Sequence, residues 1–346
     1  MKQARLHGLD LARYFAFVGM VIVNFKIAMG AETGAGLLQV LTGALEGRAA
    51  ATFVVLAGVG LGLSARHAQA NSIFVTLKRA LFLLVIGLLN MTIFSADILH
   101  YYAFYFFFGA MLLSVGSWTL AVIIGGLNLA FVAMIFLLNY DAGWNWVDYT
   151  YSGFWTPAGF VRNLFFNGWH PVIPWLGFLL FGIILSRLDP SSRSLQWRMV
   201  LGGFAAIIIA ELLSGYLNVQ FSETDPALRD LLTTQPIPPM PLYTLAGLGA
   251  ASIVIGGCLL VAHRLAAINV LQFLVPAGRQ TLTLYVAHVL IGMGTLEAMG
   301  MLGGQSITMA VCAALIFCAI ATVYAVLWAR WFKHGPLESL MRATAG

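Results

Sequence analysis

The sequence predicts an all-α integral membrane protein, a polytopic bundle of about ten transmembrane helices with both termini in the cytoplasm. Hydrophobic residues make up 60% of its 346 residues and charged residues only 9%, far from the balance of a soluble chain. Apolar stretches long enough to cross a bilayer recur from one end of the chain to the other. These stretches lack the alternation of apolar and polar residues that the strands of a membrane β-barrel show.

Ten segments have the length and apolar character of a membrane-spanning helix. In chain order they cover residues 9–29, 49–65, 77–95, 97–115, 118–138, 169–187, 197–218, 242–263, 279–299 and 307–330. No connection between them is long enough to fold alone, so we expect a single transmembrane domain over 1–346. The longest connections are 139–168, rich in Trp, Tyr and Phe, and 219–241, which prolines interrupt. The three cysteines fall inside predicted helices and suggest neither a disulfide nor a metal site.

The distribution of charge predicts how the chain lies in the membrane. Basic residues gather on alternate connections, as at Arg66, Lys78, Arg79, Arg187, Arg193, Arg264 and Arg279. Most acidic residues lie on the opposite connections. By the positive-inside rule, both termini are therefore cytoplasmic, and 139–168 and 219–241 lie outside. The net charge of +5 reflects this orientation and gives no reason to expect nucleic-acid binding.

Ionisable residues at membrane depth are costly, and each is therefore a functional candidate. Asp97 and His100 stand three residues apart at the outer end of an aromatic segment, a spacing that puts both on one helix face. The same spacing also suits an acid that only caps the helix. His288 follows Arg279 by nine residues, roughly 13 Å at 1.5 Å per residue, which places it near the bilayer midplane. It is either a site residue or a structural histidine bonded across helices.

Other polar residues extend this pattern towards both surfaces. Asp10 and Arg13 lie one turn apart near the cytoplasmic end of the first helix, as a neutralising pair or as ligand contacts. Candidate substrate contacts on the outer side are Arg48, His170 and Glu211. Together these residues predict a polar core, which either a transporter or an enzyme could use.

Eight pieces of the sequence carry a resemblance to a known family. They are LDLAR, GMVIVNF, EGRAAATFVVLAGVGLGL, LKRALFLLVIGLL, DILHYYA, HPVIPWLGFLLFGI, GRQTLTLYVAH and GPLESLMR, in this order along the chain. With them the chain resembles the transmembrane acyltransferase superfamily that includes heparan-α-glucosaminide N-acetyltransferase, and within it the bacterial inner-membrane proteins of YeiB type.

The resemblance implies transfer of an acyl group, acetyl first of all, from cytoplasmic acyl-CoA to a saccharide or other polar acceptor across the inner membrane. It implies that Arg79, Arg279 and Arg13 bind the phosphates of CoA, and that a histidine acts as general base or nucleophile without a metal. The heparan enzyme is thought to use a histidine between its first two helices, but residues 27–48 contain none. The catalytic candidates are therefore His100 with Asp97, His288 and His170.

A second class of function stays open on the residues alone. A transporter or channel for a small metabolite would use the same polar core without covalent chemistry. Expected partners are membrane lipids and a small-molecule or glycan acceptor, and a homo-oligomer is compatible with the sequence.

Overall fold

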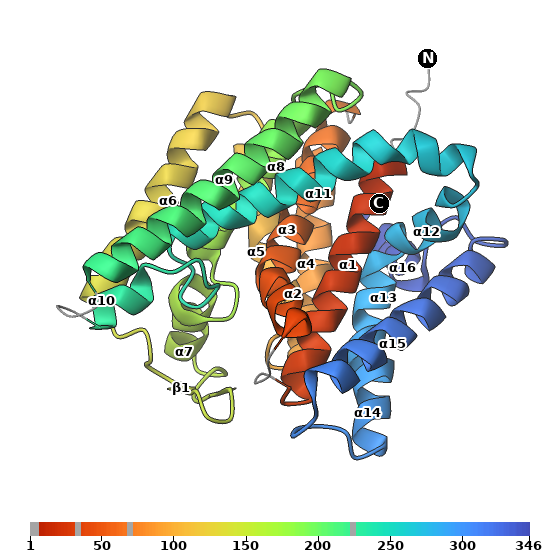
Figure 1. Cartoon of the computed structure of the whole chain (residues 1–346). Helices are drawn as coiled ribbons and strands as arrows, with labels where there is room; N and C mark the ends of the chain where they lie inside the picture. The colour runs from red at the N-terminus through yellow and green to blue at the C-terminus, as the bar shows by residue number, and fades with distance from the viewer. Residues whose placement is uncertain (1–6, 32–35, 68–71, 222–225) are drawn as a thin grey trace. The chain divides into compact units, whose positions relative to one another are not determined.

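The structure, a computed structural model, describes residues 7–31, 36–67, 72–221 and 226–346 (Figure 1). Its described residues are overwhelmingly helical, and their only sheet is an antiparallel pair, β1 (Trp144–Asn145) with β2 (Thr150–Tyr151). The predicted all-α class is confirmed. The predicted cytoplasmic N-terminus, residues 1–6, lies outside the described residues.

The helices follow one another with short connections. In chain order they are α1 (His7–Ala28), α2 (Leu37–Leu45), α3 (Arg48–His67), α4 (Ser72–Met91), α5 (Leu99–Leu112), α6 (Ser117–Leu137), α7 (Pro157–Arg162), the π-helix η1 (Asn163–Asn167), α8 (Val172–Ser186), α9 (Arg193–Gln220), α10 (Pro226–Leu231), α11 (Pro241–Ala267), α12 (Leu271–Gly278), α13 (Thr281–Ala287), the π-helix η2 (His288–Met293), α14 (Gly294–Ala298), α15 (Ile307–Trp328) and α16 (Pro336–Ala345).

Among the described residues, eight helical segments are long and apolar enough to cross a membrane, and a bent pair, Pro157–Asn167 with Val172–Ser186, makes up to nine. The chain is therefore a multi-pass membrane protein. All ten predicted segments are helical, but the one at 97–115 is shorter than expected, because α5 has 14 residues. At 1.5 Å per residue this helix is about 21 Å long, less than a hydrocarbon core of about 30 Å. The turn that joins α4 to α5 takes up residues 92–98.

Contacts divide the chain into two compact units. The first comprises Met1–Phe53, Pro190–Leu201 and Ala251–Thr344, and the second comprises Val54–Asp189, Gly202–Ala250 and Ala345–Gly346. The single transmembrane domain predicted over 1–346 stays a prediction, because compact units defined by contacts need not be independent domains.

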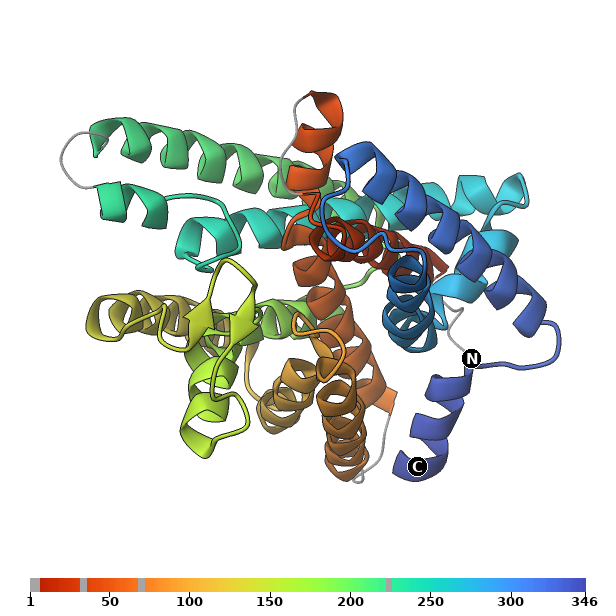
Figure 2. The same cartoon turned by 90° about the horizontal axis from the view of Figure 1, so that it is seen from below.

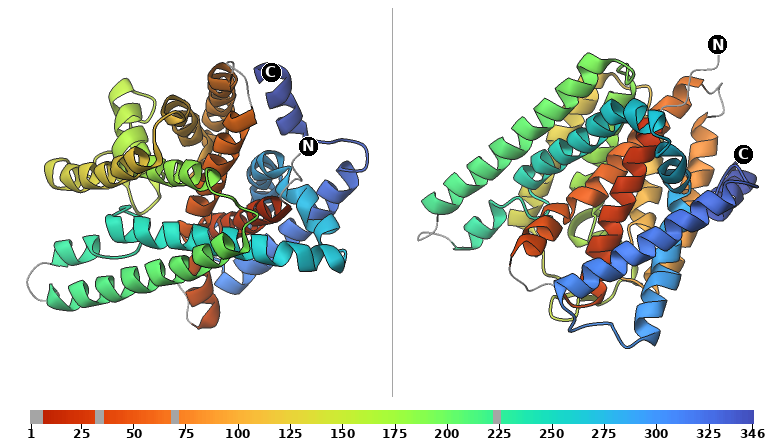
Figure 3. Two further views of the ribbon diagram at one scale, coloured as in Figure 1. Left: turned by 90° about the horizontal axis from the view of Figure 1, so that it is seen from above. Right: turned by 45° about the vertical axis from the view of Figure 1, so that its right-hand side comes forward.

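In the first unit, α1 packs against α12, α13 and α15 (Figure 3, right). Its buried face is mostly apolar, with Leu11, Phe17 and Val21 fully buried. Asp10 is an exception, since it is also almost fully buried in this face. The first unit thus carries a charged group into its core.

In the second unit, α4 and α5 lie side by side as a hairpin, and α8 packs on both α5 and α6 (Figure 2). The approach of α4 to α5 depends on Gly87, because a Cβ atom there would lie 2.3 Å from the backbone nitrogen of His100. This close contact presses the first turn of α5, with His100, against α4.

Candidate functional site

The most concentrated polar group of the second unit is the Asp97–His100 pair that the sequence singled out. Both side chains are fully buried, Asp97 in the turn before α5 and His100 in the first turn of α5. The Nδ1 atom of His100 lies 3.5 Å from Oδ2 of Asp97, within ion-pair distance. The predicted proximity of the two side chains is therefore present in the fold.

Asp97 has two structural tasks besides facing the imidazole. Its Oδ1 atom accepts a hydrogen bond of 2.7 Å from the amide of Asn90 in α4. Its Oδ2 atom accepts from the backbone nitrogens of Leu99, at 2.8 Å, and His100, at 3.4 Å. The carboxylate thus caps α5, as in the simpler interpretation of the motif, and also stands next to the ring. Capping of the helix and contact with the imidazole are compatible, because the capping bonds hold the carboxylate beside the ring.

The His100 ring is surrounded by aromatic side chains. Its centre lies 3.9 Å from that of the neighbouring Tyr101 and 5.9 Å from that of Phe154. Among the described residues, neither ring nitrogen of His100 has a hydrogen-bond partner. Because a buried polar group without such a partner is unfavourable, it calls for an explanation such as a catalytic role.

Two tyrosines connect α5 to the segment around His170. Tyr101 donates a hydrogen bond of 2.6 Å to Oδ1 of Asn163 in η1, and Tyr105 donates one of 2.6 Å to the backbone carbonyl of His170. The His170 ring lies 5.9 Å from the Tyr101 ring and 4.6 Å from the Trp175 ring. The rings of His100 and His170 thus both lie next to the ring of Tyr101 in the second unit. Sequence reasoning missed both tyrosines and Asn163, because an aromatic run gives no sign of which hydroxyls find partners.

His288, the second candidate histidine, is equally buried but fully bonded. It begins η2 in the first unit, and its Nδ1 atom contacts the backbone carbonyl of Tyr285. A carbonyl only accepts, so Nδ1 carries the hydrogen, and Nε2 of the neutral ring accepts from the amide of Asn24, 2.9 Å away. This is the arrangement expected of a structural histidine bonded across helices.

The buried Asp10 forms ion pairs with two arginines of the predicted donor site. Arg13 donates from Nη1 to Oδ1 at 2.8 Å, and Arg279 donates from Nε to Oδ2 at 3.1 Å. Nη2 of Arg279 also lies 3.3 Å from Nδ1 of His7. Two cations on one carboxylate leave a net positive charge, and both guanidinium groups stay about 30% exposed, at 27% for Arg13 and 30% for Arg279.

A pocket of about 430 Å³ in the first unit includes this same His7. Its polar lining comes from His7, Ser191, Arg193, Gln196 and His263. From the sequence, Arg193 is noted only as part of a basic connection, and His263 is not a candidate. The signal that could have found them is their position at the ends of α9 and α11, both on the predicted cytoplasmic side.

The remaining predicted residues occupy separate places. Arg79 is half-buried in α4 of the second unit, and Arg48 is half-buried at the start of α3 in the first. Glu211 is exposed on α9 and accepts a hydrogen bond of 2.9 Å from Thr234. Nearby, Ser214 and Asn218 both donate to the carbonyl of Leu232, so this polar stripe holds the loop after α10.

The part of the chain that the structure describes contains no group of three or more His, Cys, Asp or Glu residues able to hold a metal ion.

Comparison with protein families gives two matches. The family model described as heparan-alpha-glucosaminide N-acetyltransferase, catalytic, matches residues 5–217. A second, described as a protein of unknown function (DUF418), matches residues 184–346. No curated protein matches the chain. The first match contains the Asp97–His100 pair, and the second contains Arg279 and His288. Because the first model covers well over half of the chain, this protein belongs to the family of the heparan-α-glucosaminide N-acetyltransferase catalytic domain.

Proposed function

We propose that this chain is a multi-pass inner-membrane enzyme that transfers an acyl group, acetyl first of all, from cytoplasmic acyl-CoA to a saccharide or other polar acceptor on the opposite side. The observation that carries the proposal is the buried His100 beside Asp97, in a chain of an acetyltransferase family. Among the described residues its ring nitrogens have no hydrogen-bond partner, so they are available to a reacting group.

The proposed reaction assigns the two ring nitrogens different tasks. Nδ1 faces Asp97, so Nε2 is the nitrogen that meets the acceptor. Nε2 takes the proton of the acceptor hydroxyl or amine as its oxygen or nitrogen attacks the thioester carbonyl carbon. The carbon–sulfur bond breaks, and the imidazolium returns the proton to the CoA thiolate. Asp97 stabilises the positive ring between the two proton transfers. The products are the acylated acceptor and free CoA.

The alternative to general-base catalysis is nucleophilic attack by the same Nε2 on the thioester. It would form an acyl-imidazole, and the acceptor would then attack that intermediate. Ping-pong kinetics and an acyl group trapped on the protein without acceptor would support this variant.

The donor site is proposed in the first unit, around Arg13 and Arg279. Guanidinium groups bind phosphate through paired hydrogen bonds, and both side chains keep exposed surface and a net positive charge around Asp10. His7, Arg193 and His263 extend the basic lining into the adjacent pocket. Arg79 is proposed as a further phosphate contact.

The acceptor site is proposed beside the Asp97–His100 pair. His170 has the best support, because it lies next to Tyr101. Arg48 and Glu211 are proposed as additional acceptor contacts, although Glu211 already holds Thr234.

Proteoliposomes with labelled acetyl-CoA on the donor side test the function. Acyl transfer to an acceptor on the other side, together with a higher unfolding temperature when acetyl-CoA is bound, would support the enzyme. Flux of a small metabolite without acyl transfer, and no stabilisation by acetyl-CoA, would instead support a transporter.

The sidedness of donor and acceptor depends on the predicted orientation. Thr150→Cys and Leu228→Cys, in a background without Cys258, Cys312 and Cys318, place single thiols in the two predicted outer connections. We expect an impermeant thiol reagent to label both in intact cells. Protection of both would reverse the orientation and exchange the two sides.

A further inference from the structure

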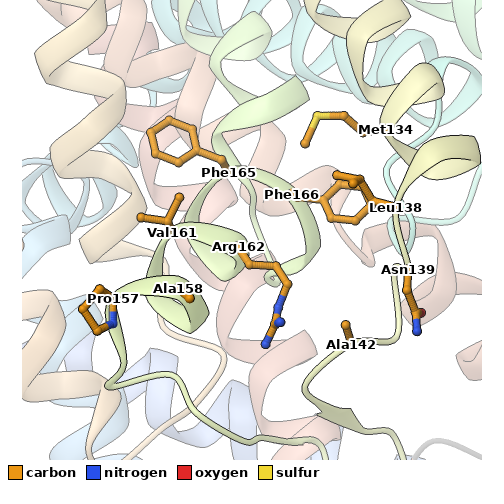
Figure 4. A pocket seen from close by; sticks show the side chains of 10 residues that line it. All are labelled: Met134, Leu138, Asn139, Ala142, Pro157, Ala158, Val161, Arg162, Phe165 and Phe166. Carbon is orange, nitrogen blue, oxygen red and sulfur yellow. The ribbon is translucent and has the colours of Figure 1, made fainter.

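The second unit contains a pocket that the proposed reaction does not use. Its volume is about 580 Å³, within the range of small-molecule sites, and it lies among the end of α6, α7 and η1 (Figure 4). The lining is apolar at Met134, Leu138, Val161, Phe165 and Phe166, with a single charged residue, Arg162. One cation in an apolar pocket indicates a ligand with an anionic group and a hydrocarbon part.

Arg162 is held in place from one edge only. Its Nε atom donates to the hydroxyl of Tyr151 at 2.7 Å, and its guanidinium carbon lies 5.5 Å from the centre of that ring. The Tyr151 hydroxyl in turn donates to Oδ1 of Asn167 at 2.9 Å. Within the described chain, the two Nη groups of Arg162 have no hydrogen-bond partner. The guanidinium is therefore oriented by one set of contacts and has donors left for a ligand.

The loop backbone is also shaped around this cation. Gly143 has a φ of +93°, and a Cβ atom there would lie 2.8 Å from Nη2 of Arg162. Glycine at this position both allows the left-handed backbone and leaves room for the guanidinium. Figure 4 shows Arg162 pointing into the space between Ala158 and Ala142, while Met134, Phe165 and Phe166 lie towards the other end of the pocket.

The surroundings of the pocket indicate its depth in the membrane. The C-terminal half of α6 exposes large apolar side chains, with Leu129 71% and Leu137 80% exposed, which is the surface expected to face lipid. The adjoining connection carries Trp144, Trp146 and Tyr151, and such aromatic residues mark the boundary between hydrocarbon and headgroups. The apolar end of the pocket thus adjoins the hydrocarbon and Arg162 adjoins the headgroups.

We propose that this pocket binds a phosphate-bearing membrane lipid, through its phosphate group and the first carbons of its hydrocarbon chain. The phosphate accepts hydrogen bonds from both Nη groups of Arg162, a geometry that favours arginine over lysine. The chain lies along Val161, Phe165 and Phe166 and continues into the bilayer. This inference stands apart from the proposed reaction, because it rests on no residue of the donor or acceptor site.

The test uses the full-length protein in nanodiscs of phosphatidylcholine that contain a photoactivatable dodecyl phosphate with a diazirine in its chain. We expect saturable labelling that maps to peptides within 134–166. Arg162→Gln should lower labelling about tenfold or more, the effect of losing a charged hydrogen bond. The control Arg229→Gln, an exposed arginine on α10, should label like the unchanged protein.

A second variant keeps the cation and removes the space. Ala158→Phe should fill the pocket and lower labelling to a similar extent, and it decides the matter where Arg162→Gln lowers the folded yield. Undiminished labelling of folded Arg162→Gln, or of Ala158→Phe, would overturn the proposal, as would equal competition by dodecyl maltoside.

Competition then identifies the source of the phosphate. Unlabelled phosphatidylglycerol that displaces the probe indicates an ordinary phospholipid, and a polyprenyl phosphate that displaces it indicates a lipid-linked carrier. Failure of both to compete would contradict a lipid phosphate site.

Discussion

His100 and His288 are both fully buried, yet they differ in how their ring nitrogens are used. His288 donates from Nδ1 to the carbonyl of Tyr285 and accepts at Nε2 from Asn24. Among the described residues, neither ring nitrogen of His100 makes a hydrogen bond. Burial alone therefore does not mark a catalytic histidine. What distinguishes His100 is hydrogen-bonding capacity that the fold has left unused.

The electrostatic surroundings differ in the same direction. Oδ2 of Asp97 lies 3.5 Å from His100 Nδ1, so a positive ring there has a negative neighbour. The two groups that hold His288, an amide and a backbone carbonyl, are neutral. The contact with a carboxylate therefore distinguishes His100 from His288, whose ring is held by neutral groups.

The largest expected effect is that of His100→Ala. The variant should fold and still bind acetyl-CoA, but lose about 10²–10⁴-fold in acyl transfer if the ring is a general base. His288→Ala is the matched comparison and should lose much less transfer per folded molecule. Single-turnover transfer measured in both variants decides the matter. Near-normal transfer by His100→Ala beside an inactive His288→Ala would reverse the assignment.

The next effect concerns donor binding in the first unit. Arg279→Gln should weaken acetyl-CoA binding by about 1–3 kcal/mol, because a charged hydrogen bond to phosphate is lost. The rate of acyl transfer at saturating acetyl-CoA should change little. Equilibrium binding and saturation kinetics separate the two. Arg264→Gln, an exposed basic residue near the end of α11, serves as the control. Unchanged affinity for Arg279→Gln would leave that residue only its contacts with Asp10 and His7.

The structural task of His288 can be measured through its partner. Asn24→Ala removes the donor to Nε2 and leaves a buried ring nitrogen without a bond, which should lower the stability by about 1–3 kcal/mol. Thermal unfolding in detergent measures the loss. Glu297→Ala, exposed on the nearby α14, should change stability by less than about 0.5 kcal/mol. An Asn24→Ala protein as stable as the unchanged one would remove the distinction between the two histidines.

Local features of this contrast could be predicted from the sequence. Long apolar segments define helices, and a spacing of three puts Asp97 and His100 on one face. Contacts between residues distant in the sequence could not be predicted in this way, because hydropathy assigns a segment to the membrane without fixing the direction of each side chain. Asn24 is 264 residues from His288, and Asp10 is 269 residues from Arg279.

The polar stripe on α9 shows the same limit from the other side. Glu211 is predicted to line a polar core, since polar residues at membrane depth are costly when exposed. In the structure Glu211 accepts a hydrogen bond from Thr234, and Ser214 and Asn218 on the same helix donate to the carbonyl of Leu232 in the loop that follows α10. A proline-broken loop has backbone groups that need partners, and its path is not encoded in the helix pattern.

The framework around His288 has one more anchor, and it carries a charge. The carboxylate of Glu338, on α16, accepts hydrogen bonds from the backbone nitrogens of Leu282 and Thr283 and from the Thr283 hydroxyl. These are donors of the first turn of α13, whose own N-cap, Gln280, makes no capping bond with its side chain. The C-terminal helix therefore caps the helix that leads to His288.

The smallest expected effect is a dependence of this anchor on pH. Burial raises the pKa of Glu338 above its ordinary value, against the opposing effect of its hydrogen bonds. The folded state then holds the proton at a pH where the unfolded state has released it. The stability that the group contributes is therefore fully present below the ordinary glutamate pKa, about 4.3, and is lost as the pH rises through the raised value. Unfolding temperatures of the unchanged protein and Glu338→Gln, compared across this range, isolate the group. The unchanged protein should lose stability relative to the variant as the pH rises, and a relative gain would mean that the capping bonds outweigh burial.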